Sequence, residues 1–185
     1  MKNLIRTTIG GLVLAALASC GAPPTNVPGF RDITKPLSVT TRANNAALHG
    51  TWFMREQFPV VNEIDRVFFV TNAPTLSSDV IETREQICRR KRVCDEKVTE
   101  WRADRLGPNR WQLVNDAGTE SFELWLIWVD SGFRTAAVGT PDGSYGWILD
   151  RSVDGGEDRI KAAREVLEFN GYETRRLVEY DRSEG

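Results

Sequence analysis

The sequence predicts an all-β protein: an eight-stranded antiparallel up-and-down barrel, with one C-terminal α-helix packed outside it and a short final strand. Two observations predict this class. From residue 48 to residue 151, short segments of β-branched and aromatic residues alternate with turn signals at regular intervals. After residue 153, the apolar period changes from that of a strand to that of a helix. A two-sheet sandwich shares the strand pattern and remains the alternative, but only closure into a barrel removes the exposed sheet edges.

Turn residues set the limits of the strands. Each break supplies Gly, Asn or Asp for a positive φ, or Pro for a preset turn. The breaks lie at residues 72–74, 107–109, 115–118, 130–132 and 141–143. The strands that they delimit are 49–58, 64–71, 79–89, 93–103, 109–115, 121–129, 132–140 and 144–151.

The later strands are apolar on both faces, whereas an earlier one is not. In 121–129, Trp125, Ile127 and Val129 share one face, and the other carries Leu124, Leu126 and Trp128. In 144–151, Ile148 opposes a face made by Tyr145, Trp147 and Leu149. Such strands must be covered on both sides. Because Glu100 and Arg102 make one face of 93–103 polar, we expect the helix to cover the later strands and not the 79–103 hairpin.

The segment Asp154 to Asn170 is predicted to be that helix. Its apolar residues fall broadly on one side, acids lie at its start where the helix dipole favours them, and Asn170-Gly171 is a stop signal. A last short strand is expected from Arg176 to Tyr180.

Residues 1–19 are typical of an export signal. A basic start is followed by an apolar run of about ten residues, which is shorter than the roughly twenty that a transmembrane anchor, the alternative, requires. Leu17-Ala18-Ser19-Cys20 resembles the lipobox of bacterial lipoproteins. The resemblance implies cleavage before Cys20, attachment of acyl chains such as palmitate to its thiol, and a lipid-anchored protein. Gly21, where the sorting pattern of that class has Asp for inner-membrane retention, implies the outer membrane with the protein facing the periplasm.

Domain limits follow from these patterns. Residues 20–47 hold four prolines and show no apolar periodicity, so we interpret them as the acylated Cys20 and a tether. The barrel domain is expected to span residues 48–182.

The net charge and the cysteines limit which partners, metal sites and cofactors are expected. Removal of residues 1–19 deletes two basic residues and no acids, which takes the net charge from −2 to −4. Nucleic acid, which requires a basic surface, is therefore not an expected partner. Cys88 and Cys94 share one predicted hairpin, and in an oxidising periplasm they are predicted to form a disulfide. A metal site is the rival, but two cysteines without a nearby histidine are too few for zinc, so no metal and no cofactor are expected.

Three pieces of the sequence resemble the lipocalin family, particularly its bacterial outer-membrane members. They are Gly50-Thr51-Trp52, which matches the family's Gly-x-Trp; Pro141 to Arg151, which resembles the last barrel strand; and Ala162 to Tyr180, which resembles the helix and closing strand. The resemblance implies that Gly50, Trp52 and Arg151 close one end of the barrel as structural residues.

The resemblance also implies a binding function. We expect a small hydrophobic ligand, of the fatty acid or lysophospholipid class, that is transported or stored in the cell envelope. The expected ligand-facing residues, chosen by strand parity and size, are Phe69, Trp101, Trp111, Trp125 and Tyr145. The alternatives are that these side chains merely fill the barrel, and that the protein is an interaction lipoprotein acting through its surface and the basic tip Arg89–Arg92. No catalytic motif is found in the sequence, so no enzyme activity is expected, and the oligomeric state is not predicted.

Overall fold

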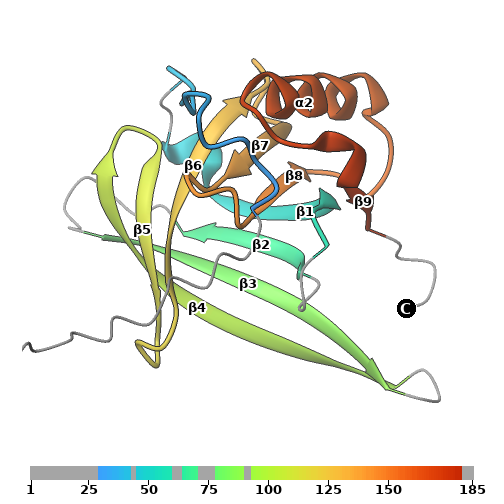
Figure 1. The fold of residues 1–185 in the computed structure, drawn as a ribbon. Coiled ribbons are helices and arrows are strands. Elements are labelled where there is room, and N and C mark those ends of the chain that lie inside the picture. The colour runs from blue at the N-terminus through green and yellow to red at the C-terminus, as the bar shows by residue number, and fades with distance from the viewer. Residues whose placement is uncertain (1–28, 43–44, 60–63, 71–77, 90–92, 181–185) are drawn as a thin grey trace, which may run out of the picture.

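A computed structural model describes residues 29–42, 45–59, 64–70, 78–89 and 93–180 of this chain, and the side chains of 29–42, 46–59, 79–85 and 95–180. The described elements follow one another as a meander of strands with a helix at the end (Figure 1). The strands are β1 Gly50–Gln57, β2 Ile64–Val70, β3 Ser78–Arg89, β4 Val93–Gly107, β5 Arg110–Asn115, β6 Ser121–Val129, β7 Thr135–Gly139, β8 Gly146–Asp150 and β9 Val178–Glu179. The helices are α1 Asn45–Leu48, α2 Glu157–Phe169 and the 3₁₀ turn η1 Thr174–Arg176.

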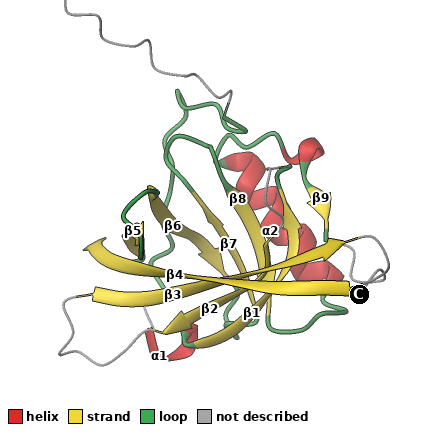
Figure 2. Ribbon diagram, turned by 90° about the horizontal axis from the view of Figure 1, so that it is seen from below, coloured by secondary structure: helices red, strands yellow, loops and turns green. Residues whose placement is uncertain are grey.

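The strands form one antiparallel sheet that closes on itself. Each strand from β1 to β8 pairs with the next, and β1 also pairs with β8, so that the ladder returns to its first strand. Figure 2 shows the strands curling into a barrel, with α2 along β7 and β8 and α1 at one end. The predicted fold class, an all-β lipocalin-like barrel with an outer C-terminal helix and a short final strand, is confirmed.

Two apolar clusters lie on the two sides of the barrel wall. The inner cluster collects alternate residues of the strands, among them Trp52, Leu113 and Leu149. The outer cluster joins Ile127 and Ile148 of the wall to Ile160, Ala163 and Leu167 of α2. Helix α2 packs on β6, β7 and β8. The expectation that the helix covers the later strands is therefore confirmed, and Glu100 and Arg102 are exposed as their alternation indicates.

Helix α2 begins three residues after the predicted start at Asp154. Gly155 and Gly156 both have positive φ, 73° and 78°, so the chain turns sharply there before it enters the helix. Other strand ends differ by a few residues. The largest difference is β4, which continues from the predicted end at 103 to Gly107 beside β5. At its other end, where β3 ends and β4 begins, the two strands form a long arm beyond the other strands (Figure 1).

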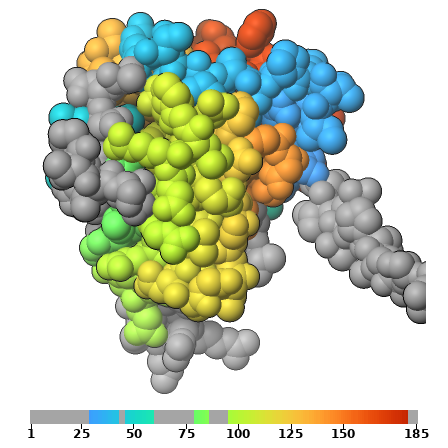
Figure 3. Space-filling model, turned by 90° about the vertical axis from the view of Figure 1, so that its left-hand side faces the viewer, coloured from blue at the N-terminus to red at the C-terminus, as the bar shows by residue number. Residues whose placement is uncertain are grey.

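The N-terminal segment 29–42 lies on the outside of the barrel, which corrects the expected domain limit near Leu48. Phe30 N–H donates to the Gly143 carbonyl at 2.7 Å, Thr40 N–H donates to the Leu126 carbonyl at 3.1 Å, and Arg42 donates to the Val129 carbonyl at 2.8 Å. Figure 3 shows the segment, in blue, on the surface beside the orange atoms that follow β7. The tether interpretation of 20–47 is therefore wrong for residues 29–42; residues 20–28 lie outside the described residues.

Candidate functional site in the barrel interior

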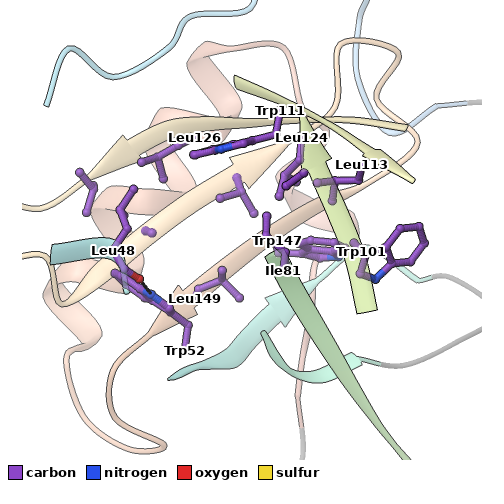
Figure 4. Close-up of a cluster of buried hydrophobic side chains, with 14 of the residues drawn as sticks. Leu48, Trp52, Ile81, Trp101, Trp111, Leu113, Leu124, Leu126, Trp147 and Leu149 are labelled. Atoms are coloured by element: carbon purple, nitrogen blue, oxygen red, sulfur yellow. Dashed lines mark hydrogen bonds between the residues drawn. The ribbon is translucent and has the colours of Figure 1, made fainter. Parts of the chain in front are cut away.

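The two ends of the barrel differ in their chemistry. At one end, here called the closed end, β1 begins beside α1 and the β4–β5 and β6–β7 turns; at the other, the open end, lie the β5–β6 and β7–β8 turns. The inner face between them is apolar and rich in indole rings (Figure 4).

Trp52 and Arg151 lie together at the closed end. The Arg151 guanidinium carbon lies 3.9 Å from the centre of the Trp52 ring, and the Trp52 indole N–H donates to the Leu48 carbonyl at 2.9 Å. Arg151 also donates to the carbonyl oxygens of Thr51, Ala47 and His49, at 2.8, 2.6 and 3.0 Å. Burial lowers the pKa of Arg151. These contacts bring together the residues for which the family resemblance implies a closing role.

Glycine is required at position 50 for two reasons. Its φ is +102°, where a side chain is strained, and an added Cβ would lie 3.3 Å from an Arg151 terminal nitrogen. The glycine of the Gly-x-Trp sequence therefore makes room for the arginine that covers the tryptophan.

A buried carboxylate also faces the interior near this end. Asp79 is 2% exposed; Arg105 donates to both of its oxygens at 2.8 Å, and the Trp111 indole N–H donates to Oδ2 at 2.8 Å. The hydrogen bonds that Arg105 donates to Asp79 raise the pKa of Arg105. Asp79 could not be predicted from the sequence, because a lone acid at the start of a strand gives no local signal of facing inward.

Four aromatic rings cluster towards the open end. Phe122 lies 5.1 Å from Trp101, 5.0 Å from Tyr145 and 6.4 Å from Trp147, measured between ring centres. Trp101 and Trp147 are buried, whereas Phe122 and Tyr145 are partly exposed. Burial raises the pKa of Tyr145, with help from the charges of Glu120 and Asp142. Sequence parity could have found Trp147, which shares a strand face with Tyr145.

Polar groups stand beside these rings on β3 and β4. The Trp101 indole N–H donates to Thr83 Oγ1 at 2.9 Å. The next pair on this face towards the open end is Glu85 and Lys97. Lys97 Nζ lies 3.4 Å from Glu85 Oε2; the Lys97 side chain is 51% exposed and the Glu85 side chain 11%. One cation and one anion therefore lie beyond the rings towards the open end.

The five expected ligand-facing residues do not all lie on the inner face of the barrel. Trp101 and Trp111 belong to the inner cluster, and Tyr145 packs against it. Trp125 does not: it lies on the outer face, where its indole N–H donates to Glu123 at 2.9 Å and Arg110 lies 5.3 Å from its ring centre. The expectation for Trp125 is therefore wrong. Phe69 pairs with Gly50 and Ile81 in the sheet, and its side chain lies outside the described residues.

The expectation for Trp125 is wrong because both faces of β6 are apolar. β6 is apolar on both faces, so alternation alone does not say which face is inside. The inner face carries Leu124 and Leu126, and the register shifts between Leu126 and Trp128, so that Ile127 and Trp128 both contact the outer cluster.

Cys88 and Cys94 lie directly opposite each other in the register of β3 and β4. Their side chains lie outside the described residues, as do Cys20 and the residues 90–92 of the basic tip, so the disulfide, the lipid anchor and the tip contact stay predictions. Among the described residues, no group of three or more His, Cys, Asp or Glu is arranged to hold a metal ion. No helix of the described part is long and apolar enough to cross a membrane.

Comparisons with known proteins agree with this geometry. Residues 105–182 match the family model of the lipocalin-like domain. Among solved structures, apocrustacyanin C1 and lobster apocrustacyanin A1 each superpose with a TM-score of 0.55 at 12% identity, over 74% of this chain and 78% of theirs. H1 crustacyanin from the lobster Homarus americanus superposes with a TM-score of 0.50 at 13% identity, over 70% of this chain and 74% of its own. No curated protein matches the sequence.

Proposed function

We propose, on the premise that this chain has the lipocalin fold, that it binds a small hydrophobic molecule between the aromatic rings of its inner face and stores or carries that molecule in the cell envelope. The lipocalin fold supports binding of small hydrophobic ligands, and lipocalins are generally binding or transport proteins rather than enzymes. The observation that carries the proposal is the cluster of Trp101, Phe122, Tyr145 and Trp147, two of whose rings are only partly buried.

The ligand class that fits is an amphiphile with one long acyl chain. The inner face offers apolar contact, and the indole N–H groups of Trp52, Trp101 and Trp111 already donate within the protein. Recognition therefore depends on apolar area rather than on polar contacts deep inside. Burial of a dozen methylenes yields about 10 kcal/mol gross, against at least about 4 kcal/mol lost on association. A fatty acid or a lysophospholipid reaches micromolar affinity on these terms, with its head group near Glu85 and Lys97.

We also propose that Cys20 is acylated and anchors the protein to the outer membrane, facing the periplasm. The sequence Leu17 to Cys20 at the end of an apolar segment supports this. Metabolic labelling with a radioactive fatty acid should mark the protein, and Cys20→Ala should abolish the label. A label that persists in Cys20→Ala would refute the anchor.

Fluorescent fatty acid titration tests the ligand proposal. Trp101→Ala should weaken binding about tenfold, because one aromatic wall contact of roughly 1.5 kcal/mol is lost. Trp125→Ala, which removes the same side chain from the outer face, is the matched control and should change the dissociation constant less than twofold. Equal effects of the two variants, or no saturable binding of any lipid, would shift the weight to an interaction protein with a filled barrel.

A further inference from the structure

The path of the chain before the barrel shows which end of the barrel lies beside Gly29, the described residue that is nearest to Cys20 in the sequence. Phe30 and Arg31 bond to the β7–β8 turn: Phe30 N–H donates to Gly143, and Arg31 donates to the Pro141 carbonyl at 2.9 Å. Both turn residues belong to the open end. Segment 29–42 then runs along the outer wall to Arg42, which donates to Val129 at the closed end. The chain therefore meets the barrel at its open end.

Ring contacts and hydrogen bonds hold the beginning of segment 29–42 against the barrel. The Phe30 ring lies 4.7 Å from the Phe58 ring, which lies 5.5 Å from the Tyr172 ring. Arg31 is 7% exposed and also donates to the Asn170 carbonyl at 2.9 Å. These contacts hold Gly29 beside the β7–β8 turn.

The distance available to an anchor at Cys20 is short. Positions 20 and 29 are nine steps apart in the sequence, and a fully extended chain of that length reaches about 30 Å. The eight residues of β1 span about 26 Å along the strand, which at the usual barrel tilt of about 40° is about 20 Å from the closed end to the open end. A membrane at the closed end would use about two thirds of the reach of this segment, whereas a membrane at the open end would not.

Exposed apolar side chains lie beside the same point. Asp32 N–H donates to the Gly171 carbonyl at 2.9 Å. Ile33 follows Asp32 and is 68% exposed, and Phe169 lies two residues before Gly171 and is 82% exposed. No other large apolar side chain in the described part of the chain is as exposed as these two.

We propose that the open end of the barrel rests on the lipid bilayer, with Ile33 and Phe169 inserted among the lipid head groups. The side chains of Arg175 and Arg176 lie 3.7 and 3.9 Å from Glu173, which offsets part of the positive charge beside these two apolar side chains. In this position a lipid passes between the membrane and the barrel without crossing water, a consequence that rests on the proposed ligand binding.

Photo-cross-linking tests the orientation. The full-length protein, as processed by the cell, is reconstituted into phosphatidylcholine vesicles that contain a lipid with a photoreactive group near its glycerol, and cross-linked peptides are mapped by mass spectrometry. Adducts at Ile33 and Phe169 are expected. Adducts at Leu106 and Val153, which are 47% and 40% exposed near the closed end, or adducts at both ends alike, would overturn the proposal.

Matched variants separate docking from ligand binding. Ile33→Ser with Phe169→Ser should slow transfer of a fluorescent fatty acid from vesicles to the protein about tenfold. Leu106→Ser with Val153→Ser should slow it less than twofold, and neither pair should change the affinity measured without vesicles. Equal transfer rates in the two double variants would refute docking while the ligand proposal stands. If no fatty acid binds in solution, the ligand proposal fails, and the cross-links still decide the orientation.

Discussion

Replacement of Arg151 by methionine removes the cation from the closed end while keeping most of the apolar stem. The guanidinium lies 3.9 Å from the centre of the Trp52 ring, a contribution of about 1–2 kcal/mol for a partly desolvated cation. It also donates to three carbonyl oxygens that belong to residues 47, 49 and 51, two of these bonds lying at exposed sites. Allowing for solvent at those sites, we expect Arg151→Met to lower the free energy of unfolding by about 2–4 kcal/mol.

Urea unfolding followed by tryptophan fluorescence measures this change, with all variants in the same nonionic detergent. At this chain length the melting temperature should fall by on the order of 10 °C. The matched control is Arg102→Met on the outer face of β4, where the side chain is 60% exposed beside Asp104; its effect should stay within about 0.5 kcal/mol.

A double-mutant cycle with Trp52→Leu isolates the ring contact, and a coupling of about 1 kcal/mol is expected. If Arg151→Met and Arg102→Met destabilise the protein equally, the closing role of Arg151 is wrong.

Three further predictions concern stability. Burial raises the pKa of Tyr172 to about 12, so between pH 10 and 12 the unfolded chain loses the hydroxyl proton while the folded chain keeps it. The free energy of unfolding should therefore fall by about 2–3 kcal/mol as the pH rises through this window. Tyr172→Phe should remove that part of the pH dependence. Asp79→Asn should lower the free energy of unfolding by about 1–3 kcal/mol, because a buried site that accepts three hydrogen bonds loses its charge and one acceptor atom; an unchanged urea midpoint would contradict this. Protein isolated without reductant should carry a Cys88–Cys94 disulfide detectable in a non-reduced peptide map, and its reduction should lower stability by roughly 2 kcal/mol; free thiols in both positions would refute the pairing.

The sequence alone was sufficient for the fold class. Strand and helix periods are local properties, and turn residues mark their limits, so eight strands and a C-terminal helix could be placed within a few residues. The polar face that carries Glu100 and Arg102 also showed correctly which hairpin the helix leaves uncovered. The pairing of Trp52 with Arg151 came from the family resemblance, because no local pattern relates residues about a hundred positions apart.

Tertiary structure alone decided which side of a two-sided strand is inside. Trp125 and Leu124 are both apolar, and only the packing of β6 between β5 and β7 shows that the Trp125 indole faces outward. The course of residues 29–42 could not be predicted from the sequence either. The hydrogen bonds of this segment go to partners up to 139 residues away and impose no period on its sequence. Local propensity depends on neighbouring residues. The choice of the inner face and the position of the N-terminal segment depend instead on how distant parts of the chain pack together.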